Sequence, residues 1–401
     1  MDPLTATVPR LRICSWNIWF DTFEREARLL GVFGELRARQ LDVVCLQEVV
    51  PAVARRLHEL LARAGLAGEY ATSDDACGKS GASVAPYGVL VLCRRALLPE
   101  FRIHELPTHM DRRLVTCTIA GSSGSGGGGG GGGGHRGEGG AGAGAPQMWA
   151  AVVGSVHLES LNSAALRRGQ LAAAAVKLSE LAALPHPHTQ VQAPVLGVLC
   201  GDFNFDDRRN FGRPVGEGPL ENSENMAALA ERGGQRWHDA WLQHRPAARA
   251  AAEAAAALAA AGGAPLAAVA GGEREAAALE AAEEMAAELG VELGVEAGFT
   301  FDTEANSMLT SWHPGARYRL DRLVLTNYGG GGGCRLWRTA SIDRVGTEAI
   351  RAAESESRGC FDSPPRAGTT ALRADAGPNP THRLFCSDHF GLVASLELLP
   401  S

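Results

Sequence analysis

The chain has 401 residues, nine cysteines and a formal net charge of −7. Nine Glu against two Arg between residues 247 and 297 account for that charge, so the rest of the chain has 36 residues of each sign and is neutral. This balance does not exclude a nucleic acid partner, which needs only a local basic stripe. The cysteines have no Cys-x-x-Cys spacing, which argues against a zinc module and indicates buried thiols in a reducing compartment.

The apolar patterns, taken in chain order, predict strands and helices along most of the chain. They begin with a strand at 11–17, a helix at 24–39, a strand at 42–47 and a helix at 52–64. The rest are strands at 88–93, 114–119 and 150–157, a helix at 164–184, a strand ending at Gly201, a helix at 226–243, and strands at 319–326 and 391–398. Several strands adjoin without a helix between them, which favours two packed mixed sheets with helices outside.

Three stretches interrupt this pattern and are expected to be low-complexity insertions in a single domain that spans residues 11–398. Residues 121–146 are nearly all Gly and Ser, which cannot bury apolar surface. Residues 247–297 are rich in Ala and Glu, a composition typical of a solvated face. Gly, Pro, Arg and Ser dominate residues 329–383, so we expect mostly loop there, with order confined to 339–351.

The most informative short motif is the Gly-Asp-Phe-Asn run at the end of an apolar stretch. Side chains alternate along a strand, so Asp202 and Asn204 point to one face where the chain leaves the sheet. Chemistry in α/β folds is usually found at that position. The same residues also form Asx turns after buried strands, with Gly201 supplying backbone freedom. The motif by itself leaves a catalytic pair and a simple turn equally open.

Five further islands carry polar side chains suited to a metal or a phosphate. Four of them end apolar runs and the fifth begins one: Ser-Trp-Asn17, Leu-Gln-Glu48, His157-Leu-Glu-Ser, Ser-Asp388-His389 and Leu-Asp321-Arg. Taken singly, such residues are more often caps or turn formers. Taken together, they predict one site built from strand ends.

In this order the six motifs resemble those of the endonuclease/exonuclease/phosphatase superfamily, in which they converge on one divalent-metal site. The resemblance covers residues 11–398 and implies an α/β four-layer sandwich of two mixed β-sheets flanked by helices. Three runs are most similar to the tyrosyl-DNA phosphodiesterase 2 group: His157-Leu-Glu-Ser followed by Arg167-Arg168, Phe299-Thr-Phe301-Asp-Thr, and Ser-Asp-His389-Phe-Gly. The implied substrate is DNA that carries a 5′ covalent tyrosyl adduct on a single-stranded end, and the implied process is DNA repair.

Three positions depart from that group. Trp19 stands where many relatives carry an acidic residue, which makes Asp21 the nearest substitute. Asp206 stands where the group has an Arg two residues after the Asn of the Gly-Asp-x-Asn motif, and Phe301 replaces a Trp. Weaker stacking and a lost phosphate contact predict weaker DNA binding than in typical members.

Phosphodiester hydrolysis needs an activated water, neutralised phosphate charge and help for the leaving oxygen. Hard cations prefer carboxylate oxygen, so Glu48, Asp388 and Asp21 are expected to hold Mg²⁺, for which Mn²⁺ can substitute. The expected catalytic residues are Asn17 and His157 on the phosphate, Asp202 on the water, Asn204 on a phosphate oxygen, and His389 with its ring fixed by Asp321. The expected substrate-binding residues are Tyr87, Arg167, Arg168, Phe301 and Trp19.

Two alternatives stay open. One keeps the site and changes the substrate to that of an abasic-site nuclease or exonuclease, a deadenylase, or a phosphoinositide or sphingolipid phosphodiesterase. The other is an inactive binding scaffold. The N-terminus lacks a signal pattern, and the uncharged residues 254–272 are interrupted by Pro265, so we expect a soluble, intracellular monomer in the nucleus or cytoplasm without a membrane span.

Overall fold

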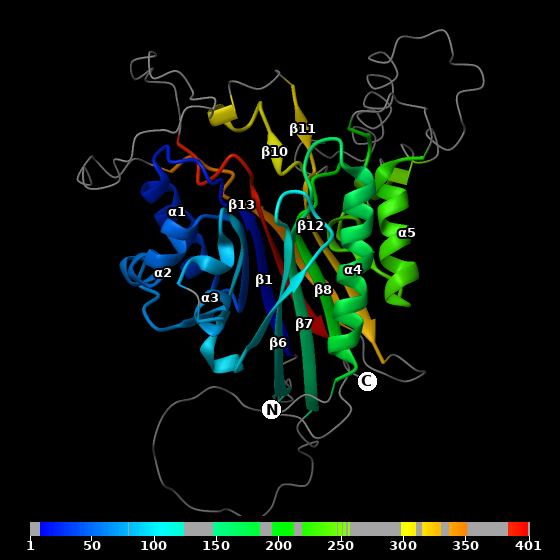
Figure 1. Ribbon diagram of the computed structural model, residues 1–401, viewed down its shortest axis with the longest axis horizontal. Coiled ribbons are helices and arrows are strands. Elements are labelled where there is room, and N and C mark those ends of the chain that lie inside the picture. Colours follow the sequence, from blue (N-terminus) through cyan, green and yellow to red (C-terminus); the bar gives the residue numbers. More distant parts are fainter. Residues whose placement is uncertain are drawn as a thin grey trace, which may run out of the picture.

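The computed structural model describes residues 9–78, 80–123, 147–184, 195–211, 219–246, 298–309, 315–329, 337–350 and 384–399, together with 248–250, 252–253 and 256. These residues form two six-stranded β-sheets packed face to face, with helices on both outer surfaces (Figure 1). The predicted four-layer α/β sandwich is therefore confirmed.

Each sheet is assembled from distant parts of the chain. The first has the order β13 (Trp337–Val345), β14 (Gly391–Leu398), β1 (Arg10–Asn17), β2 (Val43–Val49), β4 (Gly88–Arg94), β3 (Tyr70–Thr72). The second has the order β5 (Glu100–Glu105), β6 (Arg113–Ser123), β7 (Gln147–His157), β8 (Val195–Asp202), β12 (Asp321–Tyr328), β9 (His238–Asp239). A separate pair, β10 (Phe301–Asp302) and β11 (Arg317–Tyr318), lies at one end of the sandwich (Figure 1).

Helices cover the outer faces of both sheets. α1 (Arg25–Arg39) and α2 (Pro51–Arg63) lie on the first sheet, and α4 (Ala164–Ala182) and α5 (Glu221–Gly233) lie on the second (Figure 1). The short helices are α3 (Ser73–Ala76), α6 (Ala240–His244) and the 3₁₀ turns Ala82–Val84, Arg95–Leu97 and Ser307–Leu309. Three apolar clusters fill the spaces between sheets and under the two helix layers, which accounts for the packing of the sandwich.

The alternation of side chains along each strand decides which layer a residue joins. On β1, Leu11 and Ile13 enter the cluster between the sheets, whereas Cys14 and Trp16 pack under the helices. Asn17 continues the inward series, so it points between the sheets where β1 ends. The same alternation directs the last residue of β8 inward.

Strand register brings several such residues to one end of the sandwich, here called the site pole. Parallel pairing of β1 with β2 aligns Asn17 with Gln47. Parallel pairing of β7 with β8 aligns His157 with Asp202. Because β12 runs antiparallel to β8, its first residue, Asp321, also lies opposite Asp202.

One predicted helix, at 226–243, is wrong. α5 ends at Gly233 because Gly234 adopts a left-handed φ of 61°. Asp239 then caps α6 by accepting from Trp241 N at 3.0 Å. The ordered part expected at 339–351 is the edge strand β13, which begins at Trp337.

Most of the three expected insertions, namely residues 124–146, 257–297 and 351–383, lie outside the described residues. Where the chain is described, none of its helices combines the length and the apolar character that a membrane span needs. The cysteines in the same part of the chain are free thiols, and six of the seven are buried.

Candidate active site

Two carboxylates, one from each sheet, meet at the amide of Asn17. Its Nδ2 donates to Glu48 Oε1 at 3.1 Å and to Asp202 Oδ2 at 3.0 Å. Asn17 is fully buried, and its Oδ1 accepts from Trp19 N at 3.0 Å, which fixes the orientation of the amide. Three residues that the sequence singled out are therefore in direct contact.

Glu48 reaches this position through an irregularity in β2. The register between β2 and β4 shifts after Leu46, and Glu48 has a left-handed φ of 61°. Phe20 N donates to Glu48 Oε2 at 3.0 Å. Burial and the nearby charge of Asp388 nevertheless raise the pKa of Glu48 to about 7. A carboxylate in this environment gains stability from a cation placed beside it.

The acids at the site pole fit a divalent cation. The ligand atoms of Glu48, His157 and Asp202 lie within 4.8 Å of one another, and so do those of Asp202, Asp321 and His389. Asp321 Oδ1 is buried without a hydrogen-bond partner among the described residues. Oxygen-rich donor sets are those that hard cations prefer, so these residues suit such an ion.

The two remaining predicted metal ligands lie in different surroundings. Ser387 Oγ lies 2.6 Å from Asn17 O and 3.1 Å from Asp388 Oδ1, so its single hydroxyl proton can be donated to either, and Asp388 lies beside the end of β1. Asp21 Oδ1 accepts from Phe23 N at 2.7 Å in a local turn. Among the described residues Asp21 joins neither group of close ligand atoms. Asp388 joins neither group of described residues either, but it lies near enough to Glu48 for its charge to raise the pKa of that residue, so the structure brings Asp388 and not Asp21 toward the acids.

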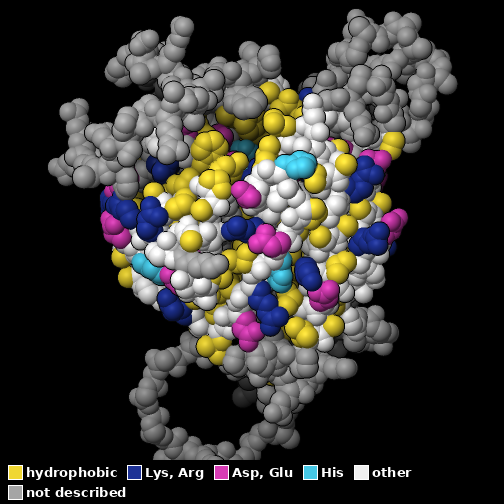
Figure 2. All heavy atoms as spheres, in the orientation of Figure 1, with side chains coloured by type: hydrophobic (Ala, Val, Ile, Leu, Met, Phe, Trp, Pro, Cys, Tyr) yellow, Lys and Arg dark blue, Asp and Glu magenta, His cyan; other side chains and the backbone are white. Residues whose placement is uncertain are grey.

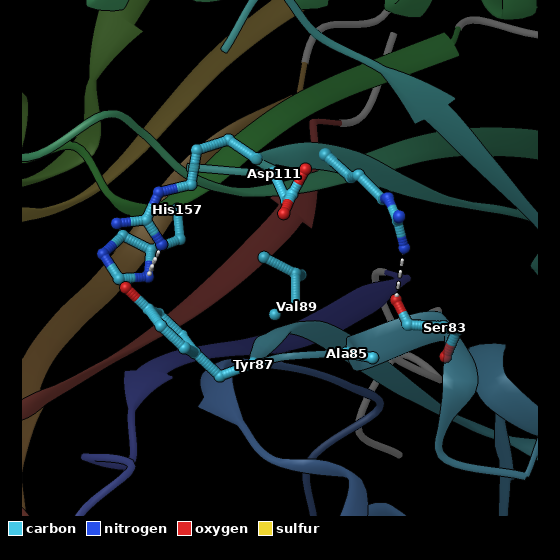
Figure 3. A pocket seen from close by; sticks show the side chains of 9 residues that line it. Ser83, Ala85, Tyr87, Val89, Asp111 and His157 are labelled. Carbon is cyan, nitrogen blue, oxygen red and sulfur yellow. Dashed lines mark hydrogen bonds between the residues drawn. The ribbon is translucent and has the colours of Figure 1, made fainter. Parts of the chain in front are cut away.

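His157 is held as a neutral imidazole. Arg112 NH1 donates to His157 Nδ1 at 3.0 Å, so the ring proton lies on Nε2, which faces Asp202 Oδ2 at 3.5 Å. Burial and the charge of Arg112 lower the pKa of His157 to about 3. Figure 3 shows His157 and Tyr87 side by side at the wall of a pocket of about 10 Å³, close to the volume of one water.

His389 is held in the opposite charge state. Its Nδ1 donates to Asp321 Oδ2 at 2.7 Å, and Thr300 Oγ1 accepts from Asp321 N at 3.0 Å. Burial alone would lower the pKa of His389, but Asp321 and Asp388 raise it well above its ordinary value. Phe301 meets the His389 ring edge-on at a centroid distance of 5.5 Å. The site therefore contains one neutral imidazole and one imidazolium.

Asn204 lies next to Asp202 in a left-handed turn with a φ of 54°. Its backbone N–H donates to Asp202 Oδ1 at 2.9 Å, and its Nδ2 donates to Leu158 O at 3.0 Å. The Asx turn that the sequence left open is thus present. An amide has two hydrogens, so a phosphate oxygen could still accept the second one.

The His-Leu-Glu-Ser run acts as a structural clamp. Glu159 is fully buried and accepts from Thr108 Oγ1 and His109 N, both at 2.8 Å. Gln170 Nε2 also donates to Glu159 Oε2 at 3.2 Å. These contacts hold the segment that carries Arg112 against the end of β7.

Arg167 and Phe301, two of the expected substrate-binding residues, are enclosed, whereas Arg168 reaches the surface. Arg167 is 0% exposed and binds Glu221 through Nε at 2.5 Å and NH2 at 2.8 Å. Arg168 reaches the surface, but its NH2 donates to Glu224 Oε2 at 2.9 Å. Phe301 is only 5% exposed. A guanidinium or ring enclosed in this way cannot contact a phosphate or base at the surface.

The exposed aromatic surface lies instead on the segment after β1. Phe20 is 39% exposed and stacks on Tyr87 with ring centroids 5.2 Å apart. Arg112 Cζ lies 5.3 Å from the centroid of the Tyr87 ring. Trp19 is half-buried under Arg28, whose Cζ lies 4.7 Å from its ring. Phe20 and Tyr87 therefore form the aromatic part of the rim.

Asp206 has a structural place in this chain. It is fully buried and accepts from Arg208 N at 2.9 Å and from Arg319 N at 2.8 Å. These bonds tie the loop after β8 to the segment before β12. The two strand ends that carry Asp202 and Asp321 are thus held together by the residue that departs from the relatives' Arg.

Sequence reasoning missed three residues that shape the site. In the sequence, Arg112 is simply one member of an Arg-Arg pair, and Phe20 is an apolar residue that follows a predicted strand. Thr300 lies within the Phe-Thr-Phe-Asp-Thr motif but was not predicted as a site residue. Their contacts join residues far apart in the chain, such as Arg112 and His157, which are 45 positions apart. Such contacts leave no periodic pattern in a single sequence.

Comparison with known proteins places this geometry in context. The profile described as "Endonuclease/Exonuclease/phosphatase family" matches residues 14–389. No curated protein matches the sequence. Among solved structures, D. rerio TDP2 complexed with a single-strand DNA product is 19% identical, with a TM-score of 0.51 over 97% of this chain and 99% of that chain.

Two further solved structures are similar to this chain. TDP2 from Caenorhabditis elegans is 17% identical, with a TM-score of 0.50 over 99% of this chain and 77% of that chain. The human Nocturnin catalytic domain with a bound sulfate is 12% identical, with a TM-score of 0.44 over 98% of this chain and 97% of that chain. At these identities, the likeness to the two TDP2 structures shows a shared fold.

Proposed function

This chain belongs to the endonuclease/exonuclease/phosphatase family, whose members hydrolyse phosphoester bonds, and we propose that it is a Mg²⁺-dependent phosphodiesterase acting on 5′-phosphotyrosyl bonds at DNA ends. The main observation that supports phosphodiesterase activity is that the carboxylates of Glu48 and Asp202 both accept hydrogen bonds from the Asn17 amide. The neutral His157 and the charged His389 belong to the same site. An enzyme with this substrate would serve DNA repair.

The acids at the pole support a metal-dependent reaction. Glu48 would hold the cation together with Asp388, whose charge already acts on Glu48, and the ligand atoms of Asp202 and His157 lie close to that of Glu48. When bound, Mg²⁺ or Mn²⁺ supplies a Lewis acid that neutralises phosphate charge and lowers the pKa of water. The raised pKa of Glu48 supports this assignment, because a neighbouring cation would favour the ionised carboxylate.

The side chains would divide the remaining work. Asp202 would orient the attacking water and accept its proton. Burial alone would raise the pKa of Asp202, but the charge of the His389 imidazolium and the hydrogen bond from Asn17 keep that pKa below its ordinary value, so Asp202 is ionised at neutral pH. The second N–H of the His389 imidazolium would donate to a non-bridging phosphate oxygen and stabilise developing charge. Asn17 would hold the carboxylates of Glu48 and Asp202 at a fixed separation.

The choice of substrate rests on three supports. The tyrosyl-DNA phosphodiesterase runs of the sequence lie around the site, and the D. rerio TDP2 structure of the same fold contains a single-strand DNA product. In addition, the exposed Phe20 ring on Tyr87 offers apolar surface next to Glu48. An aromatic leaving group could pack on such a surface.

A substrate panel tests the proposal. Purified protein with Mg²⁺ would be given a 5′-tyrosyl oligonucleotide, abasic duplex DNA, oligoadenylate and a phosphoinositide at equal salt, with the Asp202→Asn variant as the control for contaminating activity. We expect the tyrosyl substrate to have the highest kcat/KM and EDTA to abolish turnover. A tenfold preference for any other substrate would move the assignment to another branch of the family. Full turnover in excess EDTA would contradict the metal site.

A further inference from the structure

A wide groove rich in arginine lies at the end of the sandwich opposite the site pole. It has a volume of about 970 Å³ and is lined where β1 and β2 begin and β4 ends. Its charged lining, here called the arginine groove, consists of Arg10, Arg12, Arg37, Arg94 and Arg95 with Asp42 and Glu69. Five Arg against two acids give this lining a net charge of +3, and one of the five, Arg10, lies 3.9 Å from Glu397 outside the lining.

The two acids of the groove are both engaged by one arginine. Arg94 lies 3.7 Å from Asp42 and 3.5 Å from Glu69. Arg37 and Arg95 are exposed, and neither forms an ion pair within the part of the chain that the structure describes. Two guanidinium groups are therefore left to bind an anion from solution.

In each of the other Arg pairs of the sequence, at least one member is buried, stacked or ion-paired. Arg112 and Arg167 are buried, and Arg208 stacks over the Phe299 ring at 4.5 Å. Arg56 forms ion pairs with Glu26 of α1 and with Glu59 of α2. On the face drawn in Figure 2, positive and negative side chains are mixed. Because the body outside residues 247–297 is neutral, an excess of +3 in one groove is a local basic stripe.

The groove is separate from the site. β1 runs from Arg10 and Arg12 at the groove to Asn17 at the site, and its eight residues span roughly 25 Å. Charges along one strand of DNA are spaced at about 3.4 Å, so about seven nucleotides cover this length. A strand that keeps this stacked geometry and binds at both places would have to be about that long.

We propose that the arginine groove binds the phosphate backbone of a nucleic acid strand, away from the end that is processed at the site. This inference rests on the proposed function for its choice of nucleic acid as the polyanion. It would explain how the chain holds a long substrate away from the acids of the site. Affinity would come mainly from the groove, and bond cleavage from the site pole.

The test is a binding measurement that needs no hydrolysis. Fluorescence anisotropy in EDTA compares an unmodified 20-nucleotide single strand with a trinucleotide, for the full chain and for the Arg37→Glu/Arg95→Glu variant. At about 0.1 M salt we expect the variant to bind the 20-mer at least about tenfold more weakly and to show a shallower salt dependence, since about 0.7 is lost from the slope per phosphate contact.

The matched control is Arg102→Glu/Arg232→Glu, which changes the net charge equally at exposed positions outside the groove. We expect this control to bind the 20-mer like the parent. If both variants bind the 20-mer equally weakly, the loss of affinity comes from the overall charge, and the proposal that the groove binds DNA is overturned. Unfolding curves in urea confirm that both variants are folded.

Two further outcomes separate this inference from the proposed function. If the groove variant binds the 20-mer with the same Kd as the parent, the groove is not a nucleic acid site. The same follows if the parent binds heparin at least tenfold more tightly than the DNA. Neither outcome changes the hydrolysis result. If the groove variant binds the 20-mer more weakly and the parent chain does not cleave 5′-tyrosyl DNA, the groove is supported and the proposed substrate is contradicted.

Discussion

Replacing Glu48 by Gln should stabilise the metal-free protein while removing its activity. The native pKa of Glu48 is about 7, against an ordinary value of 4.5. A folded-state pKa that lies above the unfolded one means that the folded protein binds more protons between these values. This contribution to stability is present below about pH 4.5 and is lost as the pH rises through 7.

The size of the effect follows from the same comparison. A pKa difference of one corresponds to 1.36 kcal/mol, so ionised Glu48 costs about 3 kcal/mol at pH 8. Gln avoids this cost but cannot accept from both Asn17 Nδ2 and Phe20 N, and one lost hydrogen bond costs about 1 kcal/mol. The variant should therefore gain about 2 kcal/mol in the free energy of unfolding at pH 8.

Urea unfolding in EDTA at pH 8 and pH 5 measures this difference. We expect the advantage of Glu48→Gln to shrink as the pH falls, because the native side chain becomes protonated. Added Mg²⁺ should stabilise the parent and not the variant, since only a ligand that binds the folded state shifts unfolding. A variant that is less stable than the parent at pH 8 would refute the reasoning, because the donors to Glu48 would then outweigh its burial.

Three further predictions concern the other site residues. Asp202→Asn and His389→Ala should each lower kcat at least about a hundredfold, on the order of 3 kcal/mol of barrier, with a combined loss smaller than the product. Near-normal rates in folded single variants would place the site elsewhere. Phe301→Ala should lower the free energy of unfolding by about 3–5 kcal/mol, because the ring is buried, and should lower kcat equally for tyrosyl DNA and a small aryl phosphodiester. A rise in KM confined to the DNA would instead support a substrate wall. Arg167→Met should cost about 3–5 kcal/mol in urea unfolding by leaving Glu221 buried and unpaired, whereas Arg168→Met, at a partly exposed pair, should cost about 1 kcal/mol or less. Similar losses for both would contradict the difference in burial.

Much of the site could be predicted from short-range patterns. Apolar runs that end in Asn17, Glu48, His157 and Asp202 predicted strands whose last side chains carry chemistry, and the structure has those strands. This works because strand alternation and the position of a polar residue at a strand end are local properties. The family resemblance then supplied the sandwich, which links these ends across two sheets.

Local patterns could not decide which polar residues stay available to a ligand. Arg167 and Arg168 are adjacent in sequence, yet one is enclosed with Glu221 and the other is exposed. Asp21 and Asp388 carry the same carboxylate, yet only Asp388 lies beside the acids. Burial and pairing depend on neighbours such as Asn17 and Ser387, which are 370 positions apart, and one sequence does not record such contacts.

The charge states of the two histidines are the clearest product of the tertiary structure. His157 and His389 each follow from a sequence motif, and both were expected to be catalytic. Arg112 next to His157 makes that ring a neutral donor, and Asp321 next to His389 makes that ring a cation. The sequence determined by itself that two imidazoles reach the site. Only packing decided their protonation, because the energy of a buried charge is set by the partner across the fold.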